Sequence, residues 1–144
     1  MREIDEADWS ADLAHRRERG IGAYARIFDV PEKDVPAAMA DRVGPVFAQE
    51  VFLAAGGPAW SSPALTDRER TMVVITALAA QGVAGDRLEA HIRLAQRNGL
   101  DYEALAAMLA LVTNYIGQAH GSLAMEAVQR VAGSASPRSA LVKP

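Results

Sequence analysis

Cysteine is absent from this chain of 144 residues. Without it, the protein forms no disulfide bond and offers no thiolate to a metal ion. Any mechanism that needs a reactive thiol, such as that of a Cys-x-x-Cys peroxidase, is excluded at the outset. The lack of cysteine does not determine the cellular compartment of the protein.

Long apolar runs are missing as well. A membrane-spanning helix needs about 18 to 20 consecutive apolar residues, and the longest candidate here, Met72–Ala80, is bracketed by Arg70 and Gln81. The N-terminal segment is acidic and lacks the apolar stretch of a secretory signal. We therefore expect a cytoplasmic protein with no membrane partner.

The chain also lacks a basic stripe. Its formal net charge is −3 and its basic residues are scattered, whereas a nucleic-acid-binding domain gathers them on one face. Phosphate loops, dinucleotide fingerprints, His-Glu-x-x-His and Gly-x-Ser-x-Gly are absent too. The three histidines, His15, His91 and His120, do not have metal-ligand spacing. We predict no nucleic-acid partner and no metal.

Hydrophobic residues make up half of the chain, and they recur at helical spacing. No strand alternation and no repeat of fixed period occurs, so the predicted fold class is all-α. The expected helices run from a cap at Ser10 to Val30-Pro31, over 35–54 with a bend at Gly44-Pro45, from Thr66 to Ala80, over 86–98, from Asp101 to Gly117, and from there to about Val131. The segment 56–63 is expected to be a loop because Gly and Pro interrupt it.

Two helix starts carry specific signals. Thr66-Asp67-Arg68-Glu69 predicts a capping box, in which the side chains of Thr66 and Glu69 each accept from the other residue's amide. The following run, Met72–Ala80, is apolar on nearly every side and predicts a buried central helix. Asp101 is expected to cap the helix that follows the left-handed stop at Gly99.

Two further predicted helices have features that bear on packing: the first helix contains glycines, and the helix over 86–98 has an apolar stripe. Gly20 and Gly22 weaken the first helix by about 1 kcal/mol each relative to Ala, and they permit close approach of a ligand or a neighbouring helix. Leu88, Ile92 and Ala95 form the apolar stripe of the helix that carries His91.

Chain length fits one domain with a sizeable core. We predict a single helical domain over residues 1–132. Residues 133–144 are rich in Ser, Pro and Gly and are predicted to form a disordered tail.

Several short segments occur in a specific order. They are Arg16-Arg17-Glu18-Arg19-Gly20, Trp60 before Pro63, Leu65-Thr66-Asp67-Arg68-Glu69-Arg70, His91-Ile92-Arg93-Leu94-Ala95 leading to Asn98-Gly99, and Tyr115-Ile116-Gly117. In this order and spacing, they resemble the carboxymuconolactone decarboxylase family, a branch of the AhpD-like superfamily, over roughly Arg16 to Val131.

The resemblance implies a compact orthogonal bundle of about six helices that assembles as trimers or hexamers. It also implies a reaction without a cofactor, in which a carboxylated muconolactone loses carbon dioxide to give an enol-lactone. The peroxidase activity of the thiol branch is not implied, because its Cys-x-x-Cys pair is absent here.

The chain departs from the family pattern near the expected substrate. Gln118-Ala119-His120-Gly121 stands where the family usually has a Pro and small residues. Arg87 replaces an acidic residue often found one turn before the family His, and 54–58 lacks the usual aromatic and acidic character. These departures leave the substrate and the reaction open while preserving the expected fold.

Three residues are candidate catalytic groups. His91 matches the family His, and a histidine with a pKa near neutrality is a natural general acid or base. Tyr115 is a candidate donor to a carbonyl oxygen, and His120 lies outside the family pattern beyond a helix break. The alternatives are a hydrogen-bonded core His for His91, a core aromatic for Tyr115, and a capping or surface His for His120.

Four residues are candidate substrate-binding groups. Arg70 is predicted to bind a spectator carboxylate, since an Arg on the departing carboxylate would stabilise the ground state. Gln118 and Gly117 lie at the turn before His120, and Trp60 is a candidate platform. The alternatives are an exposed helix Arg for Arg70, solvent exposure for Gln118, and packing or a subunit contact for Trp60.

The sequence therefore predicts an oligomeric, cofactor-free decarboxylase or lyase that acts on a small carboxylated or oxygenated ring compound. One alternative is a lyase or isomerase with a different small substrate, in which His91 and His120 form an acid–base pair. Another is a ligand-binding or scaffold protein without activity.

Overall fold

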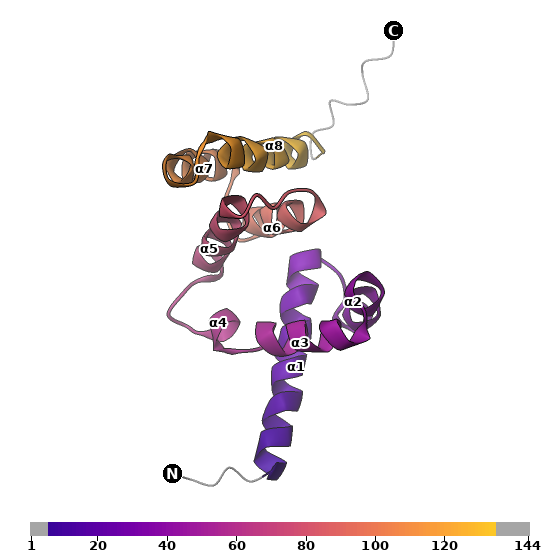
Figure 1. The fold of residues 1–144 in the computed structure, drawn as a ribbon. Helices are drawn as coiled ribbons and strands as arrows, with labels where there is room; N and C mark the ends of the chain where they lie inside the picture. The colour runs from indigo at the N-terminus through magenta and orange to yellow at the C-terminus, as the bar shows by residue number, and fades with distance from the viewer. Residues whose placement is uncertain (1–5, 135–144) are drawn as a thin grey trace. The chain divides into compact units, whose positions relative to one another are not determined.

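The computed structural model describes the backbone of residues 6–134 and the side chains of residues 11–134. Contacts within the chain divide it after Ala64 into two compact units, called here unit 1 and unit 2. Every regular element in the described residues is helical (Figure 1). The all-α class predicted from the sequence is confirmed.

Each unit contains four α-helices. Unit 1 holds α1 (Glu6–Phe28), the short 3-10 helix η1 (Glu32–Asp34), α2 (Val35–Val43), α3 (Pro45–Ala55) and α4 (Pro58–Ser61). Unit 2 holds α5 (Asp67–Ala80), α6 (Asp86–Arg97), α7 (Tyr102–Ile116) and α8 (Gln118–Ser134). The described residues thus form more helices than the six expected.

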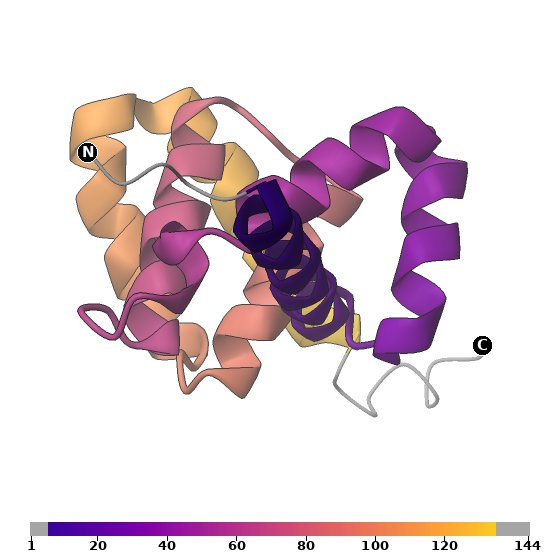
Figure 2. The ribbon, with the colours of Figure 1, turned by 90° about the horizontal axis from the view of Figure 1, so that it is seen from below.

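The structure contains two helices that the sequence did not predict as separate elements. The stretch 35–54 is broken rather than bent, because Gly44 adopts φ 86° and ψ 152° between α2 and α3; Figure 2 shows this corner. The segment 56–63 is not a loop throughout, since Pro58 begins the short helix α4. Proline fits a first helical position, where its missing N–H costs nothing.

The start of α1 also differs from the prediction, whereas its end agrees. The helix begins at Glu6, so the backbone of Ser10 is helical and Ser10 is not the cap. It ends at Phe28, shortly before Val30-Pro31, as expected from the backbone restriction that Pro imposes on its predecessor.

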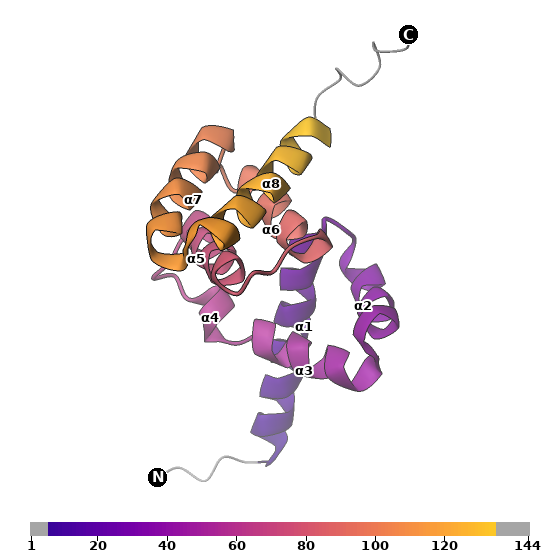
Figure 3. The same cartoon turned by 45° about the horizontal axis from the view of Figure 1, so that its top comes forward.

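Glycines allow α1 and α3 to cross in direct backbone contact. A Cβ atom added to Gly20 would overlap the carbonyl oxygen of Phe52, and one added to Gly56 would overlap that of Arg16. The close helix approach predicted at Gly20 is confirmed, and Figures 1 and 3 show α3 lying across α1. Around the crossing, the core of unit 1 consists of Ile21, Ala25, Val35, Met39, Ala48 and Phe52.

Arginines of α1 complete the crossing at the end of α3. Arg16 donates from Nε to the carbonyl of Leu53 at 2.8 Å, and Arg19 donates from Nε to the carbonyl of Gly56 at 3.0 Å. Carbonyls in the last turn of a helix lack intrahelical donors, and a cation there complements the helix dipole. These two side chains therefore terminate α3 and fix it to α1.

In unit 2, the four helices share one core. It is made of Ile75, Ala79, Leu88, Ile92, Ala95, Leu100, Leu105, Met108, Leu109, Ala124, Ala127, Val128 and Val131. The predicted stripe of Leu88, Ile92 and Ala95 on α6 is fully buried there, and Gly99 ends the turn after α6 with φ 86°. These features of α6 are confirmed.

Both predicted caps in unit 2 are present. At the start of α5, the Thr66 hydroxyl accepts from the amide of Glu69 at 3.2 Å, and the amide of Thr66 donates to the Glu69 carboxylate at 2.7 Å. The hydrogen bonds that the Glu69 carboxylate accepts from the amide and the hydroxyl of Thr66 lower the pKa of the Glu69 carboxyl from its ordinary value. Asp101 accepts from the amide of Ala104 at 2.8 Å and caps α7.

The prediction of a buried central helix over Met72–Ala80 is wrong within this chain. Only every fourth residue of α5 is buried, namely Thr71, Ile75 and Ala79, and Val73 is 59 % exposed. An apolar helix turns one stripe to its own core and leaves the opposite side chains outside when its neighbours pack on one side only.

A tight contact also joins α7 to α8. A Cβ atom added to Gly121 would overlap the Thr113 hydroxyl, which donates to the carbonyl of Leu109 at 2.7 Å. Gly117 separates the two helices with φ 93°, as the predicted interruption requires.

The predicted domain limits stay predictions. The helix α8 runs to Ser134, so the first two residues of the predicted tail 133–144 are helical, and 135–144 lie outside the described residues. Within residues 6–134, no helix has the length and apolar character needed to span a membrane.

Candidate functional site

His91 lies on α6, next to the fully buried Ile92. Its imidazole is partly buried, and its Nδ1 atom is buried with no hydrogen-bond partner among the described residues. The alternative of a hydrogen-bonded core His therefore does not describe this side chain. A buried polar atom that lacks a partner is a candidate for binding a ligand, a proton or water.

Burial also sets the charge of His91. Desolvation disfavours the imidazolium and lowers the pKa of His91 below its ordinary value of 6.5. The side chain is therefore mainly neutral near pH 7, and its imidazolium is a stronger acid than that of an exposed histidine.

A network of charges holds the first half of α6 against α8. The carboxylate of Glu89 accepts from Arg130 on α8 at 2.9 Å and from Arg93 on α6 at 3.2 Å. The hydrogen bond from Arg130 is the main cause that lowers the pKa of the Glu89 carboxyl. Glu89 stays ionised and positions the segment two residues before His91.

A polar contact fixes the other end of α6. The Asn98 amide donates to the Thr71 hydroxyl at 2.9 Å, and this hydroxyl donates to the carbonyl of Asp67 at 2.7 Å. Thr71 is the one fully buried polar side chain in the described part of the chain. Asn98 belongs to the turn recognised in the sequence, but its partner on α5 gave no sequence signal.

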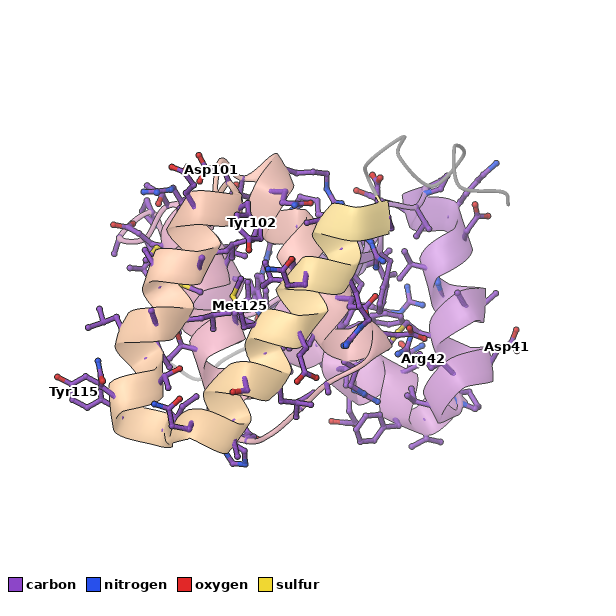
Figure 4. All side chains as sticks on the ribbon, turned by 90° about the horizontal axis from the view of Figure 1, so that it is seen from above. Asp41, Arg42, Asp101, Tyr102, Tyr115 and Met125 are labelled. Atoms are coloured by element: carbon purple, nitrogen blue, oxygen red, sulfur yellow. The ribbon has the colours of Figure 1, made fainter. Side chains whose placement is uncertain are left out.

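The other two catalytic candidates lie at the surface. Tyr115 is 86 % exposed, and Figure 4 shows its ring directed away from the end of α7. The exposed ring of His120 lies against Gly82, since a Cβ atom added there would be 3.1 Å from His120 Nε2. In the described residues, no hydrogen bond joins either side chain to His91. The roles of Tyr115 and His120 stay predictions.

One predicted binding residue lines a pocket between α7 and α8. The pocket has a volume of about 310 Å³, and Figure 4 shows Met125 of its wall between the two helices. Its lining residues are Ala106, Leu109, Ala110, Thr113, Asn114, Gln118, Gly121, Ser122 and Met125. Gln118 therefore faces a cavity, whereas His91, Tyr115 and His120 do not line this one.

Trp60 and Arg70 occupy different units. Trp60 lines a pocket of about 330 Å³ in unit 1, between α1 and the segment from α3 to α4. Arg70 of unit 2 is 11 % exposed and pairs with Asp67 at 2.8 Å. Because Asp67 is 71 % exposed, this ion pair contributes little stability, and the role of Arg70 in binding a substrate carboxylate stays a prediction.

Among the described residues, no three His, Asp or Glu side chains are grouped as ligands for a metal ion. This all-α protein therefore carries a partly buried imidazole on α6 that is mainly neutral near pH 7. It also has small pockets lined by polar and apolar groups.

Comparison with known proteins assigns the family. Residues 47–130 match the carboxymuconolactone decarboxylase family, and because this match covers more than half of the chain, the protein belongs to that family. No curated protein and no solved structure matches the chain. The match begins in α3 and includes α4 to α7 and most of α8, so it contains His91 and Trp60 but not α1 or α2.

Proposed function

We propose that the protein is a cofactor-free decarboxylase or lyase for a small carboxylated or oxygenated ring compound, with His91 moving the proton. Family membership supports a lyase-like role. The observation that carries the proposal is the buried, unpartnered Nδ1 of His91 on a helix held at both ends. A positioned acid or base requires this combination of fixed geometry and unused hydrogen-bonding capacity.

The proposed reaction needs one proton per turnover. The C–C bond to the departing carboxylate breaks, carbon dioxide leaves, and the electron pair moves into the conjugated carbonyl of the substrate. The His91 imidazolium then protonates carbon and becomes neutral, and solvent returns its proton. Because burial lowers the pKa of His91, its imidazolium is a stronger acid than that of an exposed histidine.

The lowered pKa of His91 also favours the alternative of an isomerase or a related lyase. In that reaction, the neutral imidazole removes a proton from a carbon next to a carbonyl group and returns it elsewhere. Neutral His91 is the major form near pH 7, so this reaction needs no uphill protonation. The two reactions differ in whether carbon dioxide is released.

The proposal is tested with a panel of carboxylated lactones and carboxylated ring ketones. An enzyme of this kind releases carbon dioxide, or shifts a double bond, from at least one compound with saturable kinetics. A ligand-binding or scaffold protein without activity would bind panel compounds without converting any of them.

Carboxymuconolactone is expected to be a poor substrate. Gln118 adds an exposed amide to the pocket between α7 and α8, at a position where the family usually has a Pro and small residues, so a ligand with a polar group there is favoured. We expect weak or absent release of carbon dioxide from carboxymuconolactone, measured beside the other panel compounds. Rapid and specific turnover of carboxymuconolactone that Gln118→Ala leaves unchanged would contradict this expectation.

The protein is proposed to form a homo-oligomer, as a trimer or hexamer. Large apolar side chains are exposed on both units: Val46 is 80 % exposed, Leu111 62 %, Val73 59 % and Phe47 58 %. Burial of this surface in contacts between copies would stabilise an assembly by about 25 cal/mol per Å² of apolar area. We expect light scattering at micromolar concentration to give three or six times the 15.4 kDa chain mass. A mass of one chain would refute the assembly.

A further inference from the structure

The pocket in unit 1 lies mostly outside the family match. Its α1 and η1 side is formed by Glu18, Arg19, Gly22, Ala23, Arg26 and Glu32, all of which precede residue 47. The opposite side comes from Ala55, Gly56, Trp60 and Ser61. The pocket therefore combines a part of this chain that the family match does not include with a part that it does.

We propose that this pocket binds a small planar carboxylate, with Trp60 contacting the ring and Arg19 binding the carboxylate. Its volume of about 330 Å³ lies at the lower end of the range of small-molecule sites, so the ligand is small. This inference does not depend on the proposed function, because His91 does not line the pocket.

The buried lining residues of the pocket are small and apolar. Ala23 is 2 % exposed and Ala55 is 7 % exposed, and the glycines beside them carry no side chain. The partly buried indole of Trp60 adds an aromatic wall. An aromatic side chain beside small apolar residues suits a planar ring, which gains contact area with both.

Packing does not require glycine at Gly22. A Cβ atom there would meet only the carboxylate of Glu32 at 3.2 Å and a terminal nitrogen of Arg26 at 3.8 Å, both at the ends of flexible side chains. Gly20 differs, because backbone fills its space. Gly is less favourable than Ala in a helix, and a methyl group at Gly22 would occupy part of the pocket wall beside Glu32 and Arg26.

Arg19 supplies an oriented cation. Its Nε donates to the carbonyl of Gly56 at 3.0 Å, which fixes the guanidinium at the wall of the pocket. A guanidinium carries five N–H donors, and this hydrogen bond uses one of them. The two Arg and two Glu side chains of the lining balance in charge, so the preference for a carboxylate comes from the placement of Arg19 and not from the net charge.

The two tryptophans of the chain make the site easy to monitor. Trp9→Phe leaves Trp60 as the single tryptophan of the full chain. Benzoate is the probe, benzyl alcohol is its uncharged counterpart, and acetate is the carboxylate without a ring. We expect a saturable change of Trp60 fluorescence with benzoate, and at least tenfold weaker binding of the other two compounds.

Matched variants locate the ligand. Arg19→Gln is expected to weaken benzoate binding about tenfold or more, since a hydrogen bond to a charged group contributes about 1.5 to 3 kcal/mol. Arg17→Gln is the control: it also removes an Arg hydrogen bond from α1, the one to Gln49 at 2.7 Å, but Arg17 does not line the pocket. Gly22→Ala is expected to weaken binding by filling part of the pocket, whereas Gly133→Ala is not.

Three results would overturn the proposal. They are the absence of a saturable signal with benzoate, equal affinity for benzoate and benzyl alcohol, and benzoate binding that Arg19→Gln and Gly22→Ala leave unchanged. If circular dichroism shows that Arg19→Gln does not fold, the benzoate affinity of Gly22→Ala tests the proposal. This variant is expected to fold, because the nearest atoms to its added methyl group belong to flexible side chains. His91→Gln is expected to leave benzoate binding unchanged, so the two proposals fail separately.

Discussion

Replacing His91 by glutamine is expected to lower kcat by about 10² to 10⁴, the range that a positioned acid or base contributes. Glutamine keeps a polar side chain of similar length but does not transfer a proton. Because His91 is only partly buried and its Nδ1 has no partner in the described residues, His91→Gln breaks no hydrogen bond there and the fold is expected to persist. Substrate affinity is expected to stay within a few fold.

His120→Gln is the matched control for this experiment. His120 is exposed against Gly82 and lines neither described pocket, so its substitution is expected to leave kcat unchanged. A comparable loss in both variants would favour the acid–base pair of the alternative reaction. Unchanged turnover in His91→Gln would remove His91 from the chemistry.

Gly20→Ala is expected to destabilise the protein by about 3 kcal/mol, near the upper end of the usual cost of overpacking. The new methyl group would overlap the backbone carbonyl of Phe52, which is 0 % exposed and anchors the core of unit 1. Relief requires α1 and α3 to separate, which weakens the hydrogen bonds of Arg16 and Arg19. The gain in helix propensity, about 1 kcal/mol, offsets only part of this cost.

Denaturation in urea measures the effect, with Gly133→Ala as the control. Gly133 also lies in a helix, but a Cβ atom added there meets nothing within 4 Å. Gly133→Ala should therefore be neutral or slightly stabilising. If Gly20→Ala were as stable as the unaltered protein, the direct backbone contact of α1 and α3 would be wrong.

Helix starts and ends that depend on neighbouring residues were predicted correctly from the sequence. The capping box at Thr66, the cap at Asp101 and the left-handed Gly99 each depend on a few neighbouring residues, and all three are present. The sequence-based predictions were wrong where contacts between residues far apart in the chain determine which side chains are buried. The apolar run of α5 does not reveal that only one of its stripes faces the core and that Val73 stays 59 % exposed.

Candidate site residues show the same contrast. Family resemblance selected His91, but its unpartnered Nδ1 depends on which side chains surround α6, and that has no local signature. The sequence also made Tyr115 a candidate donor to a substrate carbonyl, whereas its ring is 86 % exposed at the end of α7. Arg19 was noted only within a resembling segment, because its contact with Gly56 joins residues far apart in sequence.

The dependence of kcat/KM on pH tests the central claim, that His91 protonates the carbon left after decarboxylation. Burial lowers the pKa of His91 below 6.5, and the reaction needs its protonated form. The measurement uses the panel compound that the protein decarboxylates with the highest kcat/KM. Its kcat/KM should be highest at acidic pH and should fall as the pH rises through a midpoint below 6.5. Values that are constant through this range, or that rise with pH while carbon dioxide is released, would contradict the account.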